Sequence, residues 1–424
     1  MTRYKLLIGA CFVGMMTSGV MAQTSTNSPY TRYGFGQLSD QSFGNSQAMG
    51  GISYGLRNGL QINASNPASY SAVDSLTFIF DAGMSLQNAN FKEGDIKTNA
   101  KNSSVDYLAV QFRLMKGLGF TAGFLPYSNV GYNMSRSNVV TTDDNGTTTT
   151  ATQSYYGDGG LQQVFLGLGY NVFKGLSVGA NFSYLYGDIS HTATTAFSNS
   201  NAFSSARTHK IEVSDYKLDF GVQYTHQLKE KHVLNIGAAY SFGHDLNSTG
   251  YEYIEKYSSS TVATQTVDTI QNAFAIPHTF GIGATYVYDN RLTVGADYTL
   301  QKWEDVKFFN DNNTFQNRSK ISVGAEYLPN PIGRSYLSKV RYRVGAYYSS
   351  PYAKINGMDG NKEYGVSLGF GLPLTTYHGR SILNISGQFV KVSPKVSGML
   401  EESYLRINIG LTFNERGFMK WKVD

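Results

Sequence analysis

The sequence predicts an all-β fold: a 14-stranded antiparallel transmembrane β-barrel with an N-terminal hatch or plug segment. Three observations support this prediction. Segments in which apolar and polar residues alternate recur from about residue 76 to the end, as in Tyr404–Phe413. A leader with a positive charge and then an apolar run precedes them, and short connections alternate with long polar ones. Such strands suit a wall between lipid and a polar lumen, where closure satisfies every backbone hydrogen bond.

Residues 1–22 have the features of a secretory signal peptide. Arg3 and Lys5 form a positive n-region, an apolar stretch follows, and Val20–Ala22 places small residues before a cleavage site at Ala22/Gln23. The apolar run is too short for a lasting membrane helix. The expected location is therefore the outer membrane of a Gram-negative cell.

Composition narrows the function classes. Cys11 is the only cysteine, so a chain cleaved before Gln23 holds neither a disulfide nor a cysteine–metal site. A formal net charge of +5 is too small to indicate a nucleic-acid partner. The 31 Tyr, 25 Phe and 45 Gly beside only 15% charged residues suit aromatic girdles and a crowded lumen.

Fourteen strand-like segments follow the leader and a polar stretch. They lie near residues 76–90, 103–115, 118–139, 158–173, 175–195, 207–228, 232–255, 266–289, 291–308, 315–328, 339–356, 361–374, 381–393 and 402–414. Connections after even-numbered segments are tight, such as Lys116-Gly117, whereas Ser135–Asp158, His191–Arg207 and Glu252–Thr266 are predicted as long polar loops. Outer-membrane barrels alternate short periplasmic turns with long outer loops in this way. Residues 76–414 are therefore assigned to the barrel and residues 415–424 to a short periplasmic tail.

Residues 23–75 lack the strand pattern and are assigned to a periplasmic hatch or plug. They are rich in Gly, Ser, Asn and Gln but contain scattered apolar residues that need burial, including Phe35, Leu60 and Ile62. The barrel lumen offers that burial. A disordered tail is the alternative that the composition leaves open.

Short motifs resemble the FadL/TodX family of outer-membrane transporters for hydrophobic compounds. Asn66-Pro67-Ala68 is similar to the family's hatch motif, and Ala275–Gly283 looks like its proline-containing entry into a mid-barrel strand. Ser28–Gly36 resembles a Bacteroidetes-type variant of the group. The resemblance implies a fourteen-stranded barrel with an N-terminal hatch and hydrophobic ligands such as long-chain fatty acids.

The third predicted strand carries a second implied feature. In the family this strand kinks inward and opens a lateral gap in the wall. Pro126 lacks a ladder donor and loosens strand pairing, and Gly123 and Gly131 nearby would allow a bulge. The alternative is that Pro126 merely ends a strand near an interface.

Ligand contacts are predicted from the type of each residue and from the side of the strand on which its side chain lies. Arg341 and Arg343 share one face of a strand and Arg406 faces inward on the last strand; a guanidinium can bind a ligand carboxylate bidentately. Pairing with Asp or Glu across the lumen is the structural alternative. The candidates for an apolar pocket are Phe35, Leu60, Ile62, Phe308 and Phe309.

No enzyme activity, cofactor or metal site is expected. The G-x-S-x-G pattern occurs at Gly51–Gly55, Gly175–Gly179 and Gly365–Gly369 without a strand–turn–helix context, and the seven His form no H-x-x-x-H pair. The predicted function is passive transport of hydrophobic small molecules, surrounded by outer-membrane lipid, through loop capture, a hatch shift and lateral release. The alternatives are a PorV-like docking or shuttle barrel with a secretion-system partner, and a structural outer-membrane protein without a small ligand.

Overall fold

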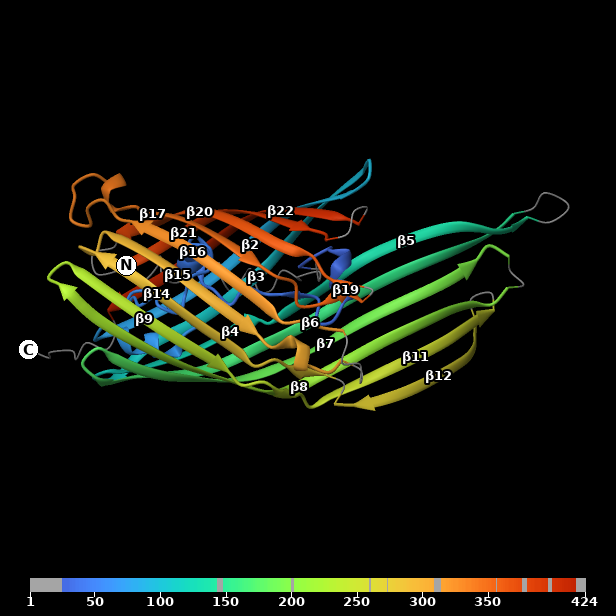
Figure 1. Ribbon diagram of the computed structural model, residues 1–424, viewed down its shortest axis with the longest axis horizontal. Helices are drawn as coiled ribbons and strands as arrows, with labels where there is room; N and C mark the ends of the chain where they lie inside the picture. The colour runs from blue at the N-terminus through green and yellow to red at the C-terminus, as the bar shows by residue number, and fades with distance from the viewer. Residues whose placement is uncertain are drawn as a thin grey trace, which may run out of the picture.

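The computed structural model describes residues 25–142, 148–199, 202–258, 261–272, 274–308, 314–355, 357–375, 380–395 and 399–416. Its antiparallel strands close into a fourteen-stranded barrel, which confirms the predicted fold class. Figure 1 shows the barrel from the side, with its strands steeply tilted. The predicted signal peptide and residues 417–424 of the predicted tail lie outside the described residues.

The wall contains continuous and interrupted strands. The continuous ones are β2 (Thr77–Glu93), β3 (Ile96–Met115), β6 (Thr148–Phe173), β7 (Leu176–Phe197), β8 (Ser204–Lys229), β15 (Leu292–Gln301), β16 (Arg318–Tyr327), β17 (Arg341–Ser349), β20 (Lys362–Thr375), β21 (Arg380–Ser393) and β22 (Glu401–Arg416). The interrupted ones are β4 (Leu118–Pro126) with β5 (Ser128–Thr142), β9 (His232–Ser241) with β11 (Ser248–Ser258), and β12 (Thr261–Gln271) with β14 (Thr279–Tyr288). Pairing of β2 with β22 closes the ring.

Short elements complete the chain. They are η1 (Pro29–Arg32), β1 (Gln37–Leu38), α2 (Gly44–Gln47), η2 (Pro67–Ala72), β10 (His244–Asp245), β13 (Ala275–Ile276), η3 (Trp303–Asp305), η4 (Leu337–Lys339), β18 (Lys354–Ile355) and β19 (Met358–Asp359). None of the helices among the described residues is long and apolar enough to cross a membrane.

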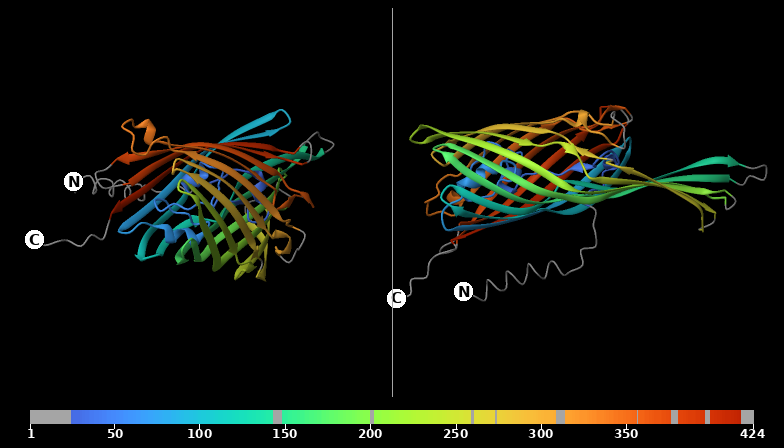
Figure 2. Two further views of the ribbon diagram at one scale, coloured as in Figure 1. Left: turned by 60° about the vertical axis from the view of Figure 1, so that its left-hand side comes forward. Right: turned by 90° about the horizontal axis from the view of Figure 1, so that it is seen from below.

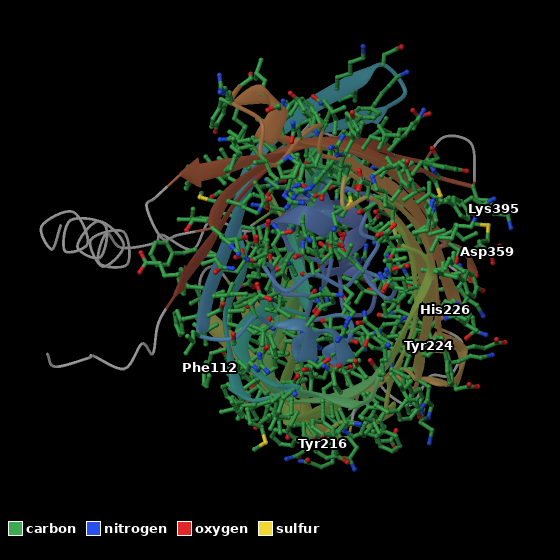
Figure 3. All side chains as sticks on the ribbon, turned by 90° about the vertical axis from the view of Figure 1, so that its left-hand side faces the viewer. Phe112, Tyr216, Tyr224, His226, Asp359 and Lys395 are labelled. Carbon is green, nitrogen blue, oxygen red and sulfur yellow. The ribbon has the colours of Figure 1, made fainter. Side chains whose placement is uncertain are left out.

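The outer face of the wall is apolar and the inner face is crowded. Val164, Leu166 and Leu168 of β6 are 44%, 52% and 47% exposed, while the intervening Phe165 is 2% exposed. Period-two alternation sends the first three side chains outward and the fourth into the lumen. Figure 3 shows Tyr224, like other aromatic side chains, on the outside of the ring of strands. This outward apolar surface is the one that a lipid-facing barrel needs.

The long outer connections are strands, and their prediction as loops was wrong. β5, β6, β7, β8, β11 and β12 continue beyond the barrel as a twisted sheet (Figures 1 and 2), with pairs such as Arg136 with Gln153 and Tyr251 with Lys210. Thr, Ser and Tyr favour strands. Because water covers both faces of this extension, its strands do not need the apolar alternation that marks the wall.

The N-terminal residues lie inside the barrel. Figure 3 shows their blue ribbon surrounded by the ring of strands. Phe43 stacks on Tyr107 of β3 with ring centroids 4.1 Å apart, and Ile62 is 0% exposed. We call residues 25–73 the inner segment; its action as a movable hatch stays a prediction.

Candidate functional site

Asn66 ties the inner segment to the barrel wall. Its Oδ1 accepts a hydrogen bond from the backbone N–H of Ala68 at 3.2 Å and thereby caps η2, with Pro67 in the first turn. Its Nδ2 donates to the carbonyl oxygen of Tyr54 at 2.8 Å and to that of Val222 in β8 at 3.2 Å. Asn is a preferred N-cap and Pro fits the first helical turn. The Asn-Pro-Ala motif is thus a helix cap that also bonds to the wall.

Paired glycines form the surface on which η2 lies. Gly119, Gly169, Gly179 and Gly221 are direct neighbours across β4, β6, β7 and β8. A Cβ atom at Gly179 would lie 2.4 Å from the Pro67 carbonyl oxygen, which is closer than any side chain tolerates. We call these four residues the glycine stripe. Sequence reasoning missed it, although the signal was present as inward-facing glycines on consecutive strands.

A second row of glycines contacts the inner segment at residues 49–52. Gly295, Gly324 and Gly345 are paired across β15, β16 and β17. A Cβ atom at Gly324 would lie 2.3 Å from the carbonyl oxygen of Met49. The inner segment is therefore in backbone contact with two sides of the lumen.

Buried charges also hold the inner segment. Asp297 of β15 accepts hydrogen bonds from the backbone N–H groups of Ser53 and Tyr54 at 2.5 Å and 2.8 Å. Arg57 donates to neutral acceptors, including Gln223 Oε1 at 3.1 Å. Burial lowers the pKa of Arg57, because removal from water disfavours the charged form.

The wall pairing is interrupted between β3 and β5. β3 pairs with β4 from Leu108 to Met115, and among the described residues its outer part, Ile96–Tyr107, pairs with β2 alone. Pro126 ends β4, and β5 pairs with β6 and with β1 of the inner segment instead of β3. Gly123 lies within β4 and Gly131 within β5. We call this interruption the β3–β5 seam.

The start of the inner segment occupies the seam. Asn27 Nδ2 donates to Asn102 Oδ1 of β3 at 2.8 Å. On the other side, the backbone N–H of Gly131 in β5 donates to Thr31 Oγ1 at 3.2 Å, and Gln37 pairs with Asn129. The inner segment therefore contacts the edge of β3 on one side and the edge of β5 on the other.

Tyr30 anchors this contact at the outer rim. Its hydroxyl donates to the carbonyl oxygen of Leu400 at 2.6 Å, and the neighbouring Ser28 Oγ donates to a Glu402 carboxylate oxygen at 2.7 Å. Burial raises the pKa of Tyr30 to about 12, so the phenol stays a protonated donor at neutral pH.

A polar lumen pocket of about 250 Å³ lies beside the seam. Asn102, Ser104 and Asp106 of β3 line it, as do Pro126 and Arg406. The volume is below the roughly 300–1,000 Å³ typical of small-molecule sites.

The three candidate arginines differ in their partners. Arg341 Nη1 and Arg343 Nε each bond a different oxygen of Glu326 at 2.6 Å. Arg406 donates instead to the amide oxygens of Gln87 at 2.7 Å and Gln388 at 3.3 Å. Arg406 therefore differs from the other two arginines, because it bonds to the neutral amides of Gln87 and Gln388 and lines the pocket.

The apolar candidates do not form one pocket. Phe35 and Phe308 belong to a cluster at the outer mouth of the barrel, with Trp303, Phe315 and Tyr352. Ile62 lies in a separate cluster with Phe43 and Tyr107. Leu60 is half-buried, and Phe309 lies outside the described residues. The sequence analysis missed Trp303 and Tyr352 because it placed them inside the predicted strands 291–308 and 339–356, whereas β15 ends at Gln301 and β17 at Ser349.

Among the described ranges, no group of three or more His, Cys, Asp or Glu side chains is placed to hold a metal ion. Ser53, the serine of one G-x-S-x-G pattern, has its backbone and side chain bonded to Asp297. This arrangement differs from a nucleophile elbow on a strand-to-helix turn.

Solved structures with a similar barrel include toluene transporters and a FadL homologue. The Pseudomonas putida toluene transporter TodX is 17% identical, with a TM-score of 0.58 over 90% of this chain and 100% of that one. The Ralstonia pickettii toluene transporter TbuX is 14% identical, with a TM-score of 0.57 over 89% and 99%. A Pseudomonas aeruginosa FadL homologue is 12% identical, with a TM-score of 0.56 over 89% and 98%. These likenesses confirm the predicted FadL/TodX-type fold.

Sequence comparison gives the family. No protein with a curated description matches the sequence significantly. A family model described as BamG matches residues 1–424, the whole length of the chain. The chain, with its FadL/TodX-type barrel, therefore belongs to the BamG family.

Proposed function

We propose that this protein is an outer-membrane channel for hydrophobic small molecules such as long-chain fatty acids, with lateral release at the β3–β5 seam. The observation that carries the proposal is the position of the seam beside the lumen pocket. Asn102, Ser104 and Asp106 belong to both. A molecule in the pocket thus lies next to a strand boundary at which, in the described part of the chain, the inner segment takes the place of a β-ladder.

The height of the seam fits release into the membrane. Met84 and Leu86 of β2 and Val105 of β3 are 45%, 44% and 60% exposed, and together they form an apolar rim on these two strands next to the seam. The seam begins at Tyr107, at the level of this apolar rim. Release there would leave an apolar molecule at the boundary between the outer water and the lipid chains.

The ligands named for structural neighbours support a hydrophobic substrate. The solved barrels with the same fold include transporters of toluene and a monoaromatic hydrocarbon channel. We extend their class of ligand, a hydrophobic compound, to this chain. Fatty acids are included because Arg406 offers a guanidinium to a carboxylate in the pocket.

A transport assay tests the proposal. The purified barrel is placed in liposomes, and uptake of a fluorescent fatty acid is compared with uptake of glucose. The proposed channel accelerates entry of the fatty acid and not of glucose. Equal acceleration of both solutes indicates a water-filled pore, and acceleration of neither contradicts transport.

Replacing Arg406 with methionine is expected to weaken fatty-acid binding by about ten- to a hundredfold. The change removes a charge-assisted hydrogen bond of about 1.5–3 kcal/mol. Binding is measured by calorimetry with palmitate and with its methyl ester. The methyl ester, which has no carboxylate, should bind both proteins alike, and so should palmitate to a control with Arg291→Met at an exposed turn. An equal loss for the ester would show that Arg406 does not read the carboxylate.

A second function, docking of a protein at the cell surface, is favoured by the outer extension. Six strands continue past the barrel as an ordered sheet, and among the described residues β12 pairs with β11 alone, so one of its edges is open. Open strand edges accept added strands from partners. A secretion-system component is one such partner. Cross-linking in intact cells from a photo-reactive residue at Thr269, compared with one at Thr225 at the opposite end, separates docking from chance contact.

A further inference from the structure

An aromatic cage at the outer mouth is filled by a side chain of the inner segment. Phe35 is 0% exposed and stacks on Phe274 with ring centroids 4.5 Å apart. Trp303 lies 5.3 Å and Phe315 6.3 Å from the same ring, and Tyr127 lies at 6.3 Å edge-on. The walls thus present both ring faces and ring edges to a flat apolar occupant, which are the arrangements that aromatic pairs prefer.

The cage walls and their occupant come from different parts of the chain. Phe274 precedes β13, Trp303 begins η3, and Phe315 precedes β16, so all three lie on outer connections of the barrel. Phe35 comes from the inner segment. The occupant can therefore leave without dismantling the walls.

Two glycines, one on either side of Phe35, allow a tight turn that places its side chain in the cage. Gly34 and Gly36 have φ angles of +61° and +78°, a region that favours glycine. A Cβ atom at Gly34 would lie 2.5 Å from Phe315 Cε1, and one at Gly36 would lie 2.4 Å from the carbonyl oxygen of Asn129. The phenyl ring therefore stands at the tip of a tight glycine-flanked turn, pressed between the cage and β5.

Besides the packing of Phe35, hydrogen bonds to the wall and to the cage hold this turn. The two pairs of β1 with β5, at Gln37 and Leu38, follow it. The backbone N–H of Ser39 donates to the carbonyl oxygen of Tyr127 at 3.0 Å, and the Tyr352 hydroxyl donates to backbone oxygens in the turn. These contacts are separate from those that η2 makes with the glycine stripe.

We propose that Phe35 is an internal ligand, and that the cage binds a flat apolar ring compound that displaces it. Displacement also withdraws β1 from β5, because Gln37 and Leu38 follow directly after Gly36. Ligand capture at the mouth is thereby coupled to opening of the seam. This inference rests on the proposed function and adds where the ligand first binds and which contact it releases.

A reversible disulfide that holds the turn of Phe35 against β5, which we call the lock, tests the inference. Gln37 and Asn129 are directly paired on antiparallel strands, a spacing that a disulfide can bridge, and the described residues contain no cysteine. A Gln37→Cys/Asn129→Cys variant is oxidised to hold Phe35 in the cage and reduced to free it. Trp421→Phe leaves Trp303 as the single tryptophan, and naphthalene binding is followed by the change in Trp303 fluorescence.

Naphthalene should bind the reduced form, and oxidation should weaken its binding at least tenfold. Phe35→Ala should bind at least tenfold more tightly than the wild type, since the competing ring is gone. Two controls should bind like the wild type. Leu56→Ala changes an apolar residue of the inner segment that packs with Met49 and Ile52, outside the cage, and an oxidised Lys92→Cys/Lys97→Cys variant places a disulfide in the distant β2–β3 hairpin.

The outcomes separate this inference from the proposed function. Equal naphthalene binding by the oxidised and reduced lock variants overturns displacement of Phe35, whether or not Phe35→Ala folds. No binding by either the reduced variant or Phe35→Ala overturns the cage as a ligand site. In both cases fatty-acid uptake in liposomes decides the transport function independently.

Discussion

Replacing Gly179 with valine is expected to lift η2 from the glycine stripe and expose the inner segment. A Cβ atom at this position would lie 2.4 Å from both the carbonyl carbon and the carbonyl oxygen of Pro67. The wall strand cannot yield, because Gly179 is paired on both sides, with Gly169 and Gly221. The helix must therefore move, and its movement breaks the bonds from Asn66 to Tyr54 and Val222.

The size of the effect follows from overpacking. Forcing extra atoms into a filled site costs about 1–3 kcal/mol, which corresponds to a roughly 5- to 150-fold larger equilibrium constant for opening of the inner segment. Hydrogen exchange of the amides in residues 43–73 measures this change directly. Ion conductance in planar bilayers should also rise, because the inner segment no longer fills the lumen.

The matched control is Gly387→Val in β21. Nothing lies within 4 Å of a Cβ atom built at Gly387, so the same substitution adds a side chain to open space. Its exchange rates and conductance should equal those of the wild type. If Gly179→Val also behaved like the wild type, the glycine stripe would not be what seats η2.

The barrel could be predicted from the sequence because the residues of each wall strand alternate between apolar side chains that face lipid and polar side chains that face the lumen. Period-two alternation such as that of Tyr404–Phe413 requires lipid on one side and a polar space on the other. The outer extension escaped prediction for the same reason. Strands such as β11 and β12 have water on both faces and pair through their backbones. Their sequences therefore do not show the alternation of apolar and polar residues by which a wall strand is recognised.

The site was less predictable because its contacts join distant residues. Asn66 could be recognised as a motif, yet its bond to Val222 depends on how the inner segment enters the lumen. Arg343 and Arg406 look alike in the sequence. Only the register of neighbouring strands places Glu326 opposite Arg343 and the amide of Gln87 opposite Arg406. The side of the strand on which a side chain lies can be inferred from the alternation of apolar and polar residues. Its hydrogen-bond partner can be identified only when the register of the neighbouring strand is known.

Replacing Glu326 with glutamine is expected to destabilise the barrel by about 3–5 kcal/mol. The carboxylate bonds Arg341 and Arg343 through its two oxygens, each at 2.6 Å, and the Arg343 side chain is 0% exposed. Removing one partner of a buried ion pair leaves an uncompensated charge, and that cost accounts for the magnitude. Asn384, which accepts from Arg343 Nη1 at 2.6 Å, is neutral and cannot replace the lost charge.

Unfolding in urea, followed by the loss of the compact band on unheated gels, measures this effect. Asp359→Asn is the control, because Asp359 pairs with Lys395 where both side chains are at least half exposed, and such pairs contribute about 0–1 kcal/mol. Adding Arg343→Met to Glu326→Gln should recover part of the loss, since the buried charge is then removed as well. If Glu326→Gln unfolded at the same urea concentration as Asp359→Asn, the lumen around Arg343 would have to be hydrated, and Arg341 and Arg343 would again become candidates for ligand carboxylate binding.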